Sequence, residues 1–219
     1  MSNGTTVKKR NGRGTEPLDL EKMHKMVEEA CKGVAGVSAS QVEIQSGIQF
    51  YDGITTAEIQ EILIKSASDL IDLDNPNYQY VAARLLLFSL RKSLYGKIRE
   101  MPHLESQIMG CTSYDVYDKE IFTKYSKEEI DKANGFIDHD RDFLFTYAGL
   151  RQVVDKYLVQ DRSTGQAYET PQFMYIMIAL TIFQNYPKEK RLNYVRRYYD
   201  AISKHKLNIP TPIMAGVRT

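Results

Sequence analysis

The chain has 219 residues, of which 42% are hydrophobic, enough for the core of one large domain or two small ones. Its 29 basic and 28 acidic side chains nearly cancel, so composition gives no attraction to nucleic acid or to a membrane surface. The longest apolar run, Phe173 to Phe183, is shorter than the roughly 20 residues that span a bilayer. Cys31 and Cys111 are the two cysteines, which is typical of a reducing compartment. We therefore expect a cytoplasmic protein, without a signal peptide and without a metal of its own.

The first segment predicts a small β element followed by a helix. Residues 7–20 (VKKRNGRGTEPLDL) have the pattern of a strand, a turn at Asn11-Gly12 and a second strand. Asp19 is a suitable N-cap for the helix that follows. Apolar residues then recur at helical spacing on one stripe: Met23, Met26, Val27 and Ala30.

Three more helices are expected before Gly96. One covers about 40–49, and another begins at the capping box formed by Thr55 and Glu58. The third extends from about Tyr78 to Tyr95, after the break at Asn75-Pro76-Asn77. Residues 1–96 are therefore predicted to form one compact domain of about four helices with a small sheet.

The remaining residues, 97–219, are also expected to be mainly helical. Helices are predicted after the capping box at Ser126, over 136–156, from Thr170-Pro171, and from Pro187 to about His205. A short hairpin is expected within 157–168. After the last predicted helix, Pro210-Thr211-Pro212 should force the chain into an extended conformation. The fold class is therefore mainly α, with a small β cap and a hairpin, and the domain junction is expected near 96–102.

A group of charged and hydroxyl side chains near the predicted helix starts is a candidate anion site. Helix N-termini present unpaired N–H groups, and nearby cations would suit a triphosphate. The group consists of Lys9, Arg10, Glu16, Lys22, Thr56 and Lys92. The pattern alone favours the simpler interpretation that these are solvated surface residues.

Three segments in this order resemble the ATP-cone of class I ribonucleotide reductase large subunits. They are VKKRNGRGTEPLDLEKMHK, QFYDGITTAEIQEILIKSA and NPNYQYVAARLLLFSLRKSLYG. Two later segments, FIDHDRDFLFTYAGLRQVVDKYLVQDRSTGQAYETPQFMYI and LNIPTPIMAGVRT, resemble the helical region that follows the cone in bacterial and phage members. The resemblance covers in effect the whole chain. It implies an N-terminal region that ends before the ten-stranded catalytic barrel.

The resemblance implies an allosteric site for ATP or dATP, with Mg²⁺ expected to accompany the nucleotide. Lys9, Arg10, Lys22 and Lys92 would neutralise phosphates, and Glu16 and Asp19 would accept hydrogen bonds from the base or sugar. The full implied set is Val7, Lys9, Arg10, Glu16, Asp19, Lys22, Thr56, Phe88 and Lys92. This chain has one extra residue in the hairpin, around Arg13-Gly14, so contacts of that loop are not carried over.

Two positions depart from dATP-inhibited members of the family. Those members have histidines where this chain has Gln60 and Ser89. Both side chains can form hydrogen bonds, but neither can gain a positive charge. We therefore expect nucleotide binding without dATP inhibition. The alternative is that other residues couple the bound nucleotide to inhibition and that the two replacements are neutral.

Thr211 matches a family position that contacts the diphosphate of the substrate, and the alternative is an ordinary residue of a rigid turn. His139 in the run DHDRD is expected to cap and pair locally. Cys31 and Cys111 do not match the family's redox or radical cysteines. The tyrosines are expected to be packing residues, with no radical role. No catalytic residue is therefore expected in this chain.

In the family that the chain resembles, the complete enzyme reduces ribonucleoside diphosphates to deoxyribonucleotides. This would require two partners, the barrel-bearing remainder of the large subunit and a radical-generating small subunit. The chain is then expected to be a split or truncated piece that is inactive alone. A non-enzymatic ATP-cone regulator is the alternative, disfavoured because no zinc-ligand spacing is present and the resemblance extends past the cone. A fragment that has lost nucleotide binding is disfavoured by Lys9, Lys22, Thr56 and Lys92.

Overall fold

The computed structural model describes residues 6–9, 14–47 and 49–219. Two compact units make up the chain: the first contains Met1–Ser89 and Phe145–Arg151, and the second contains Leu90–Leu144 and Gln152–Thr219. The division at residues 89 and 90 falls within a helix, a few residues before the junction expected near 96–102. Each unit is described separately.

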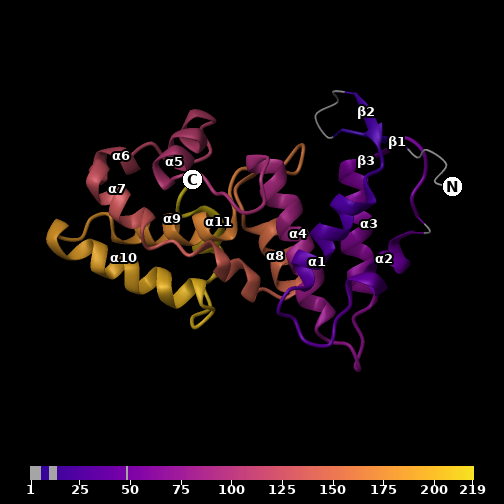
Figure 1. Cartoon of the computed structure of the whole chain (residues 1–219). Coiled ribbons are helices and arrows are strands. Elements are labelled where there is room, and N and C mark those ends of the chain that lie inside the picture. Colours follow the sequence, from indigo (N-terminus) through magenta and orange to yellow (C-terminus); the bar gives the residue numbers. More distant parts are fainter. Residues whose placement is uncertain (1–5, 10–13, 48) are drawn as a thin grey trace. The chain divides into compact units, whose positions relative to one another are not determined.

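The first unit contains a three-stranded sheet made of β1 (Thr6–Lys8), β2 (Thr15–Pro17) and β3 (Ile54–Thr55), in the order β2-β1-β3 (Figure 1). The first two strands are antiparallel, as the turn pattern predicts, whereas β1 and β3 are parallel. A strand of two residues has no periodicity to reveal it, so β3 was not expected. The predicted turn at Asn11-Gly12 lies outside the described residues.

The described part of Met1–Ser89 also contains four helices of the first unit: α1 (Leu20–Cys31), α2 (Ala39–Gly47), α3 (Thr56–Asp69) and most of α4 (Tyr78–Tyr95). Both predicted N-caps are present. Asp19 accepts a hydrogen bond from the backbone N–H of Lys22, and Thr55 forms the predicted capping box with Glu58. The apolar faces meet in a core that includes Val27, Ala30, Val42, Leu63 and Ala67, all fully buried. The expected helical bundle with a small sheet is confirmed for the described residues.

The single helix expected over 136–156 is wrong. In its place are a 3₁₀ segment η1 (His139–Leu144) and α8 (Tyr147–Lys156). The helix expected after the capping box at Ser126 is confirmed as α7 (Lys127–Asn134). Polar side chains interrupt the helix locally: Asp138 accepts the N–H of Asp140, and Thr146 accepts the N–H of Gly149. Such bonds compete with helical backbone pairing and therefore favour a break. Two further helices precede this region, α5 (Leu104–Ser113) and α6 (Ile121–Lys124).

The core of the second unit is α9 (Pro171–Phe183), which starts with a proline as predicted and is buried around its whole circumference from Pro171 to Leu180. Helix α10 (Lys188–Ser203) packs along it. Before α9, the predicted hairpin is present as β4 (Gln160–Asp161) and β5 (Gln166–Ala167). Within the described ranges, no helix combines the length and apolar character that crossing a bilayer requires.

The extended exit expected after Pro210 is wrong. Pro210 itself is extended, with φ −66° and ψ 146°, but α11 (Thr211–Gly216) begins at the next residue. Pro212 does not prevent this helix, because the first turn of a helix has no need of its N–H group. Thr211 is therefore the first residue of a short helix, not part of a rigid coil.

Candidate functional site

The small sheet brings together candidate residues from separate segments of the first unit. Val7 on β1 lies opposite Glu16 on β2 and beside Ile54 on β3. Strand β2 leads into α1 at the Thr6 end of β1, whereas β3 leads into α3 at the Lys8 end. The two helix starts that the sequence suggested as a common anion site therefore lie at opposite ends of one short strand.

Each described cation of this cluster in the first unit is paired with an acidic candidate. The ammonium of Lys9 lies 3.0 Å from the Glu16 carboxylate, and that of Lys22 lies 3.3 Å from Asp19. Hydrogen bonding from the backbone N–H of Lys22 lowers the pKa of Asp19, which keeps it charged. All four side chains are substantially exposed, so these pairs are weak and exchangeable. An anionic ligand could therefore replace a carboxylate at little cost.

The start of α3 is held rigidly to the sheet. The Glu58 carboxylate accepts the N–H of Thr55 at 2.8 Å and the hydroxyl of Tyr51 at 2.9 Å. The hydrogen bond from the Thr55 hydroxyl, followed by that from its N–H, lowers the pKa of Glu58. Asp52 accepts both the N–H and the hydroxyl of Thr6 at 2.7 Å. Thr56, the candidate at this helix start, therefore has a fixed backbone.

The sequence predicts only a turn at Tyr51-Asp52-Gly53. In the structure this segment also holds β1 through Asp52 and the start of α3 through Tyr51. Gly53 has φ +81°, a left-handed conformation that glycine adopts without strain. Its position also places the Lys8 side chain close by, with Cε at 3.9 Å from where a Cβ would be. The Tyr-Asp-Gly pattern was the one feature of the sequence that could have indicated these contacts.

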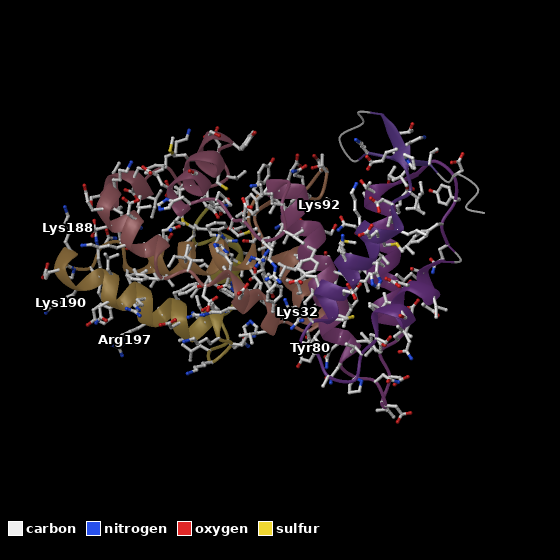
Figure 2. All side chains as sticks on the ribbon, in the orientation of Figure 1. Lys32, Tyr80, Lys92, Lys188, Lys190 and Arg197 are labelled. Atoms are coloured by element: carbon white, nitrogen blue, oxygen red, sulfur yellow. The ribbon has the colours of Figure 1, made fainter. Side chains whose placement is uncertain are left out.

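The remaining effector candidates lie on α4 or outside the described residues. Phe88 is fully buried, and Lys92 follows one turn later, exposed in the last turn of the helix and counted with the second unit (Figure 2). Arg10 lies outside the described residues. Of the two departures from inhibited family members, Gln60 is buried and its amide nitrogen lies 3.4 Å from the sulfur of Met26.

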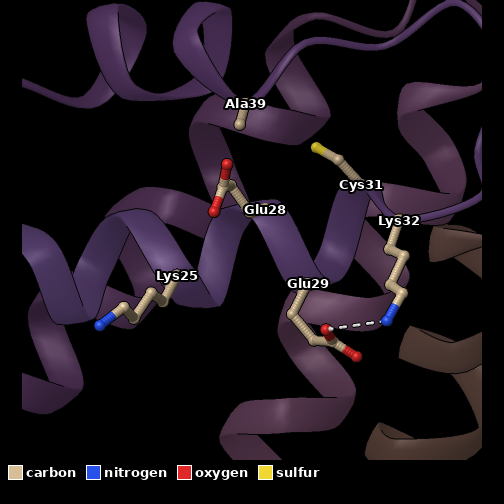
Figure 3. A pocket seen from close by; sticks show the side chains of 6 residues that line it. All are labelled: Lys25, Glu28, Glu29, Cys31, Lys32 and Ala39. Atoms are coloured by element: carbon tan, nitrogen blue, oxygen red, sulfur yellow. Dashed lines mark ion pairs between the residues drawn. The ribbon is translucent and has the colours of Figure 1, made fainter.

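A cavity of about 570 Å³ opens in the first unit, away from these candidates (Figure 3). It is lined by Lys25, Glu28, Glu29, Cys31, Lys32 and Ala39, so its walls come from the last turns of α1 and the start of α2. Burial raises the pKa of the Cys31 thiol to about 11, which leaves it protonated and unreactive at neutral pH. None of the effector candidates that the structure describes lines this cavity.

In the second unit, Thr211 lies beside a tyrosine. Its hydroxyl oxygen is 3.3 Å from the hydroxyl of Tyr157, and Thr211 is exposed to solvent. The predicted substrate residue is therefore accessible. Tyr157 gave no signal in the sequence, because it is 54 residues away and lies in no motif.

His139 does not pair locally as expected. Its ring is half-buried in a T-shaped arrangement with Phe173, at a centroid distance of 5.0 Å, and its Nδ1 has no hydrogen-bond partner among the described residues. Burial, and next the charge of Arg91, lower its pKa to about 4. The ring borders a cavity of about 340 Å³ lined by Met101, Pro102, His103, Asn134, Ile137 and His139.

The side chains of His103, Glu105 and Asp131 place three potential metal-ligand atoms within 4.8 Å of one another. The arrangement has a simpler explanation. Nδ1 of His103 accepts the N–H of Glu105 and caps α5, while Nε2 lies 3.7 Å from Asp131. Lys127 lies 3.4 Å from the Glu105 carboxylate. These groups form a helix cap, a contact between the His103 ring and Asp131, and one ion pair between Lys127 and Glu105.

Comparisons with known proteins cover most of the chain. The ATP cone domain family matches residues 5–93, and the family described as "Ribonucleotide reductase, all-alpha domain" matches residues 143–219. The chain is 49% identical over all 219 residues to the ribonucleoside-diphosphate reductase 1 subunit alpha of Escherichia coli. It is 48% identical over its whole length to the alpha subunit of Haemophilus influenzae. It is also 42% identical, over 94% of its length, to that of Enterobacteria phage T4.

The chain spans 27% to 29% of the length of these relatives. Its two family matches follow one another in the order expected from the sequence, and the first of them contains all nine effector candidates. The chain belongs to the ribonucleoside-diphosphate reductase alpha-subunit family and corresponds to its N-terminal region, an ATP cone followed by the all-alpha domain.

Proposed function

We propose that this chain is the allosteric region of a ribonucleoside-diphosphate reductase and that the first unit binds ATP or dATP. The observation that supports this most directly is the match of the ATP cone family to residues 5–93. Reduction itself would require the barrel-bearing remainder of the alpha subunit and the radical-generating small subunit. Without them, this chain would reduce no nucleotide.

The ion pairs of the first unit suggest how a nucleotide would be bound. Phosphate oxygens are strong acceptors, and they would take Lys9 from Glu16 and Lys22 from Asp19. The released carboxylates could then accept hydrogen bonds from ribose hydroxyls or the base amino group. Lys92 would supply a third positive charge, and Mg²⁺ would accompany the phosphates. Thr56 would provide a hydroxyl at the fixed start of α3, while Val7 and Phe88, which are both buried, would support the site from the core.

Calorimetric titration of the chain with ATP tests the binding proposal. Losing one charged hydrogen bond to phosphate costs about 1.5–3 kcal/mol, so Lys9→Ala and Lys92→Ala should each weaken binding about ten- to a hundred-fold. Lys119→Ala is the matched control, since this exposed lysine of the second unit is paired with Asp115. A folded chain that binds no ATP would refute the proposal.

The role of Glu16 can be separated from that of Lys9. If Glu16 only competes with phosphate for Lys9, then Glu16→Gln should tighten ATP binding. If Glu16 also accepts a hydrogen bond from the ribose or base, as we propose, the same change should weaken it by about three- to ten-fold. Tighter binding by the Glu16→Gln variant would therefore remove Glu16 from the proposed site but leave the phosphate contacts in place.

In the second unit, we propose that Thr211 donates its hydroxyl proton to the diphosphate of the ribonucleotide substrate. Its exposure and its place at the start of α11 are compatible with this role. Thr211→Ala in the complete alpha subunit should raise the KM for the nucleoside diphosphate and leave effector binding at the cone unchanged. An unaltered KM would exclude Thr211 from the substrate site.

A further inference from the structure

A buried carboxylate in the second unit collects hydrogen bonds from three separate segments. Glu169 is fully buried and accepts the backbone N–H of Val159 at 2.7 Å. It also accepts the hydroxyl of Tyr117 and the guanidinium of Arg218, whose Nε lies 3.1 Å from both carboxylate oxygens. The residues just after α8 and just after α11 are therefore held by one side chain.

Arg218 extends this connection to the backbone on both sides. Its Nη2 donates to the carbonyl of Tyr157 at 2.8 Å, and its Nη1 donates to the carbonyl of Met214 within α11. At the other end of α11, the hydroxyl of Tyr157 lies 3.3 Å from that of Thr211. Tyr157 thus contacts Thr211 at the start of α11 through its hydroxyl, and Arg218, just after the end of α11, through its carbonyl.

We propose that Tyr157 is a positioning residue for Thr211 in substrate binding, and that the buried pair of Glu169 and Arg218 holds Tyr157 in place. This inference rests on the proposed role of Thr211. A threonine hydroxyl has one proton to donate and two lone pairs that accept. An ionised diphosphate offers only acceptors, so Thr211 must donate its single proton to it. A hydrogen bond donated by Tyr157 to the Thr211 oxygen leaves that proton directed toward the ligand.

The exposure of the two hydroxyls indicates that their contact does little for stability. The hydrogen bond between Tyr157 and Thr211 lies at the surface, where water can replace either partner. The segments around it are held together instead by Glu169 and Arg218, which are fully buried. Removing the Tyr157 hydroxyl should therefore alter the orientation of Thr211 and leave the free energy of unfolding almost unchanged.

The test uses the complete alpha subunit that has this chain as its N-terminal region, assayed with its small subunit and a ribonucleoside diphosphate. Tyr157→Phe keeps the ring and removes the hydroxyl. We expect the KM to rise about three- to ten-fold, with kcat and the urea midpoint unchanged. Tyr114→Phe is the matched control, because Tyr114 is an exposed tyrosine of the same unit. It should leave the KM unchanged.

A double-mutant cycle with Thr211→Ala separates this inference from the function on which it rests. If Tyr157 acts through Thr211, adding Tyr157→Phe to Thr211→Ala should raise the KM no further. If Thr211→Ala raises the KM and Tyr157→Phe does not, or if the two effects add, the positioning role is overturned and the substrate role of Thr211 stands. If Thr211→Ala has no effect, both are overturned.

Discussion

The Nε of Arg218 lies 3.1 Å from both carboxylate oxygens of Glu169, and neither side chain is exposed to solvent. Burial opposes the charge of Arg218, but the adjacent Glu169 carboxylate outweighs it and raises the pKa of the guanidinium. The guanidinium of Arg218 therefore stays charged beside Glu169. Because Tyr117 and Val159 also donate to Glu169, the carboxylate has the partners that a buried charge needs.

Removing one member of this pair should destabilise the second unit strongly. Glu169→Gln or Arg218→Met leaves the other charge buried without its counterion, which typically costs about 3–5 kcal/mol. Urea unfolding followed by circular dichroism should show this loss for each single variant. The double variant should lose less than the sum of the two, because it leaves no unpaired charge.

The exposed ion pair between Lys119 and Asp115 in the same unit is the control. Lys119→Ala should change the free energy of unfolding by at most about 1 kcal/mol, since exposed pairs contribute little. If Lys119→Ala and Arg218→Met lowered the free energy of unfolding equally, the buried pair would contribute no more to stability than the exposed pair.

Features set by neighbouring residues could be predicted from the sequence. The capping boxes of Thr55 with Glu58 and of Ser126 with Glu129 are both present, because each needs only residues three positions apart. The pairing of Val7 with Glu16 likewise follows from one turn. Helix starts and the first hairpin are therefore local properties of this chain.

Features that join distant segments could not be predicted in the same way. Arg218 and Glu169 are 49 residues apart, and Thr211 and Tyr157 are 54 apart. No spacing rule connects them. The position of Thr56 next to β1 depends on β3, which pairs in parallel with a strand 47 residues earlier. The effector candidates could thus be named from the sequence through family resemblance, but not their ion pairs.

The two capping boxes allow a matched comparison between the units. Thr55→Ala removes the hydroxyl that accepts the Glu58 N–H and should cost about 0.5–2 kcal/mol in the first unit. It should also weaken ATP binding, because Thr55 fixes the start of α3 beside Thr56. Ser126→Ala should cost a similar amount in the second unit and leave ATP binding unchanged. Hydrogen exchange resolved by segment, together with ATP calorimetry, would measure both effects; equal ATP affinities for the two variants would contradict this account.

His139 should make the second unit sensitive to acid. Its folded-state pKa is lowered to about 4, first by burial and then by Arg91, whereas an unfolded histidine titrates near 6.5. Between these values the unfolded chain binds the extra proton, so stability falls as pH decreases from about 6.5 to about 4. The slope from this one group is at most about 1.4 kcal/mol per pH unit. Replacing His139 with Gln should reduce the slope in this window, measured by urea unfolding at several pH values.

His24 in the first unit provides a control of opposite sign. The hydrogen bond to Glu43 raises its pKa despite some desolvation, and the nearby Glu28 adds to this effect. The contribution of His24 to the free energy of unfolding is therefore fully present below about pH 6.5. It is lost as the pH rises through the higher pKa of His24 in the folded state. His24→Gln should alter the alkaline side of the profile and not the acid side. An acid slope unchanged by His139→Gln would disprove the assignment to His139.

The ATP cone of this chain should bind dATP without inhibiting the complete reductase. ATP and dATP differ by one hydroxyl, so a switch requires contacts that differ between two states. The family resemblance implies that dATP-inhibited members have histidines where this chain has Gln60 and Ser89. Gln60 is buried with its amide nitrogen 3.4 Å from the sulfur of Met26, and an amide cannot acquire a positive charge. We therefore expect the complete reductase to bind dATP at the cone and to stay active.

The measurement is a dATP titration of activity with the specificity effectors held constant, combined with light scattering. The variant with Gln60→His and Ser89→His should gain inhibition, whereas a wild-type enzyme that loses its activity at micromolar dATP and forms a larger assembly would prove the prediction wrong.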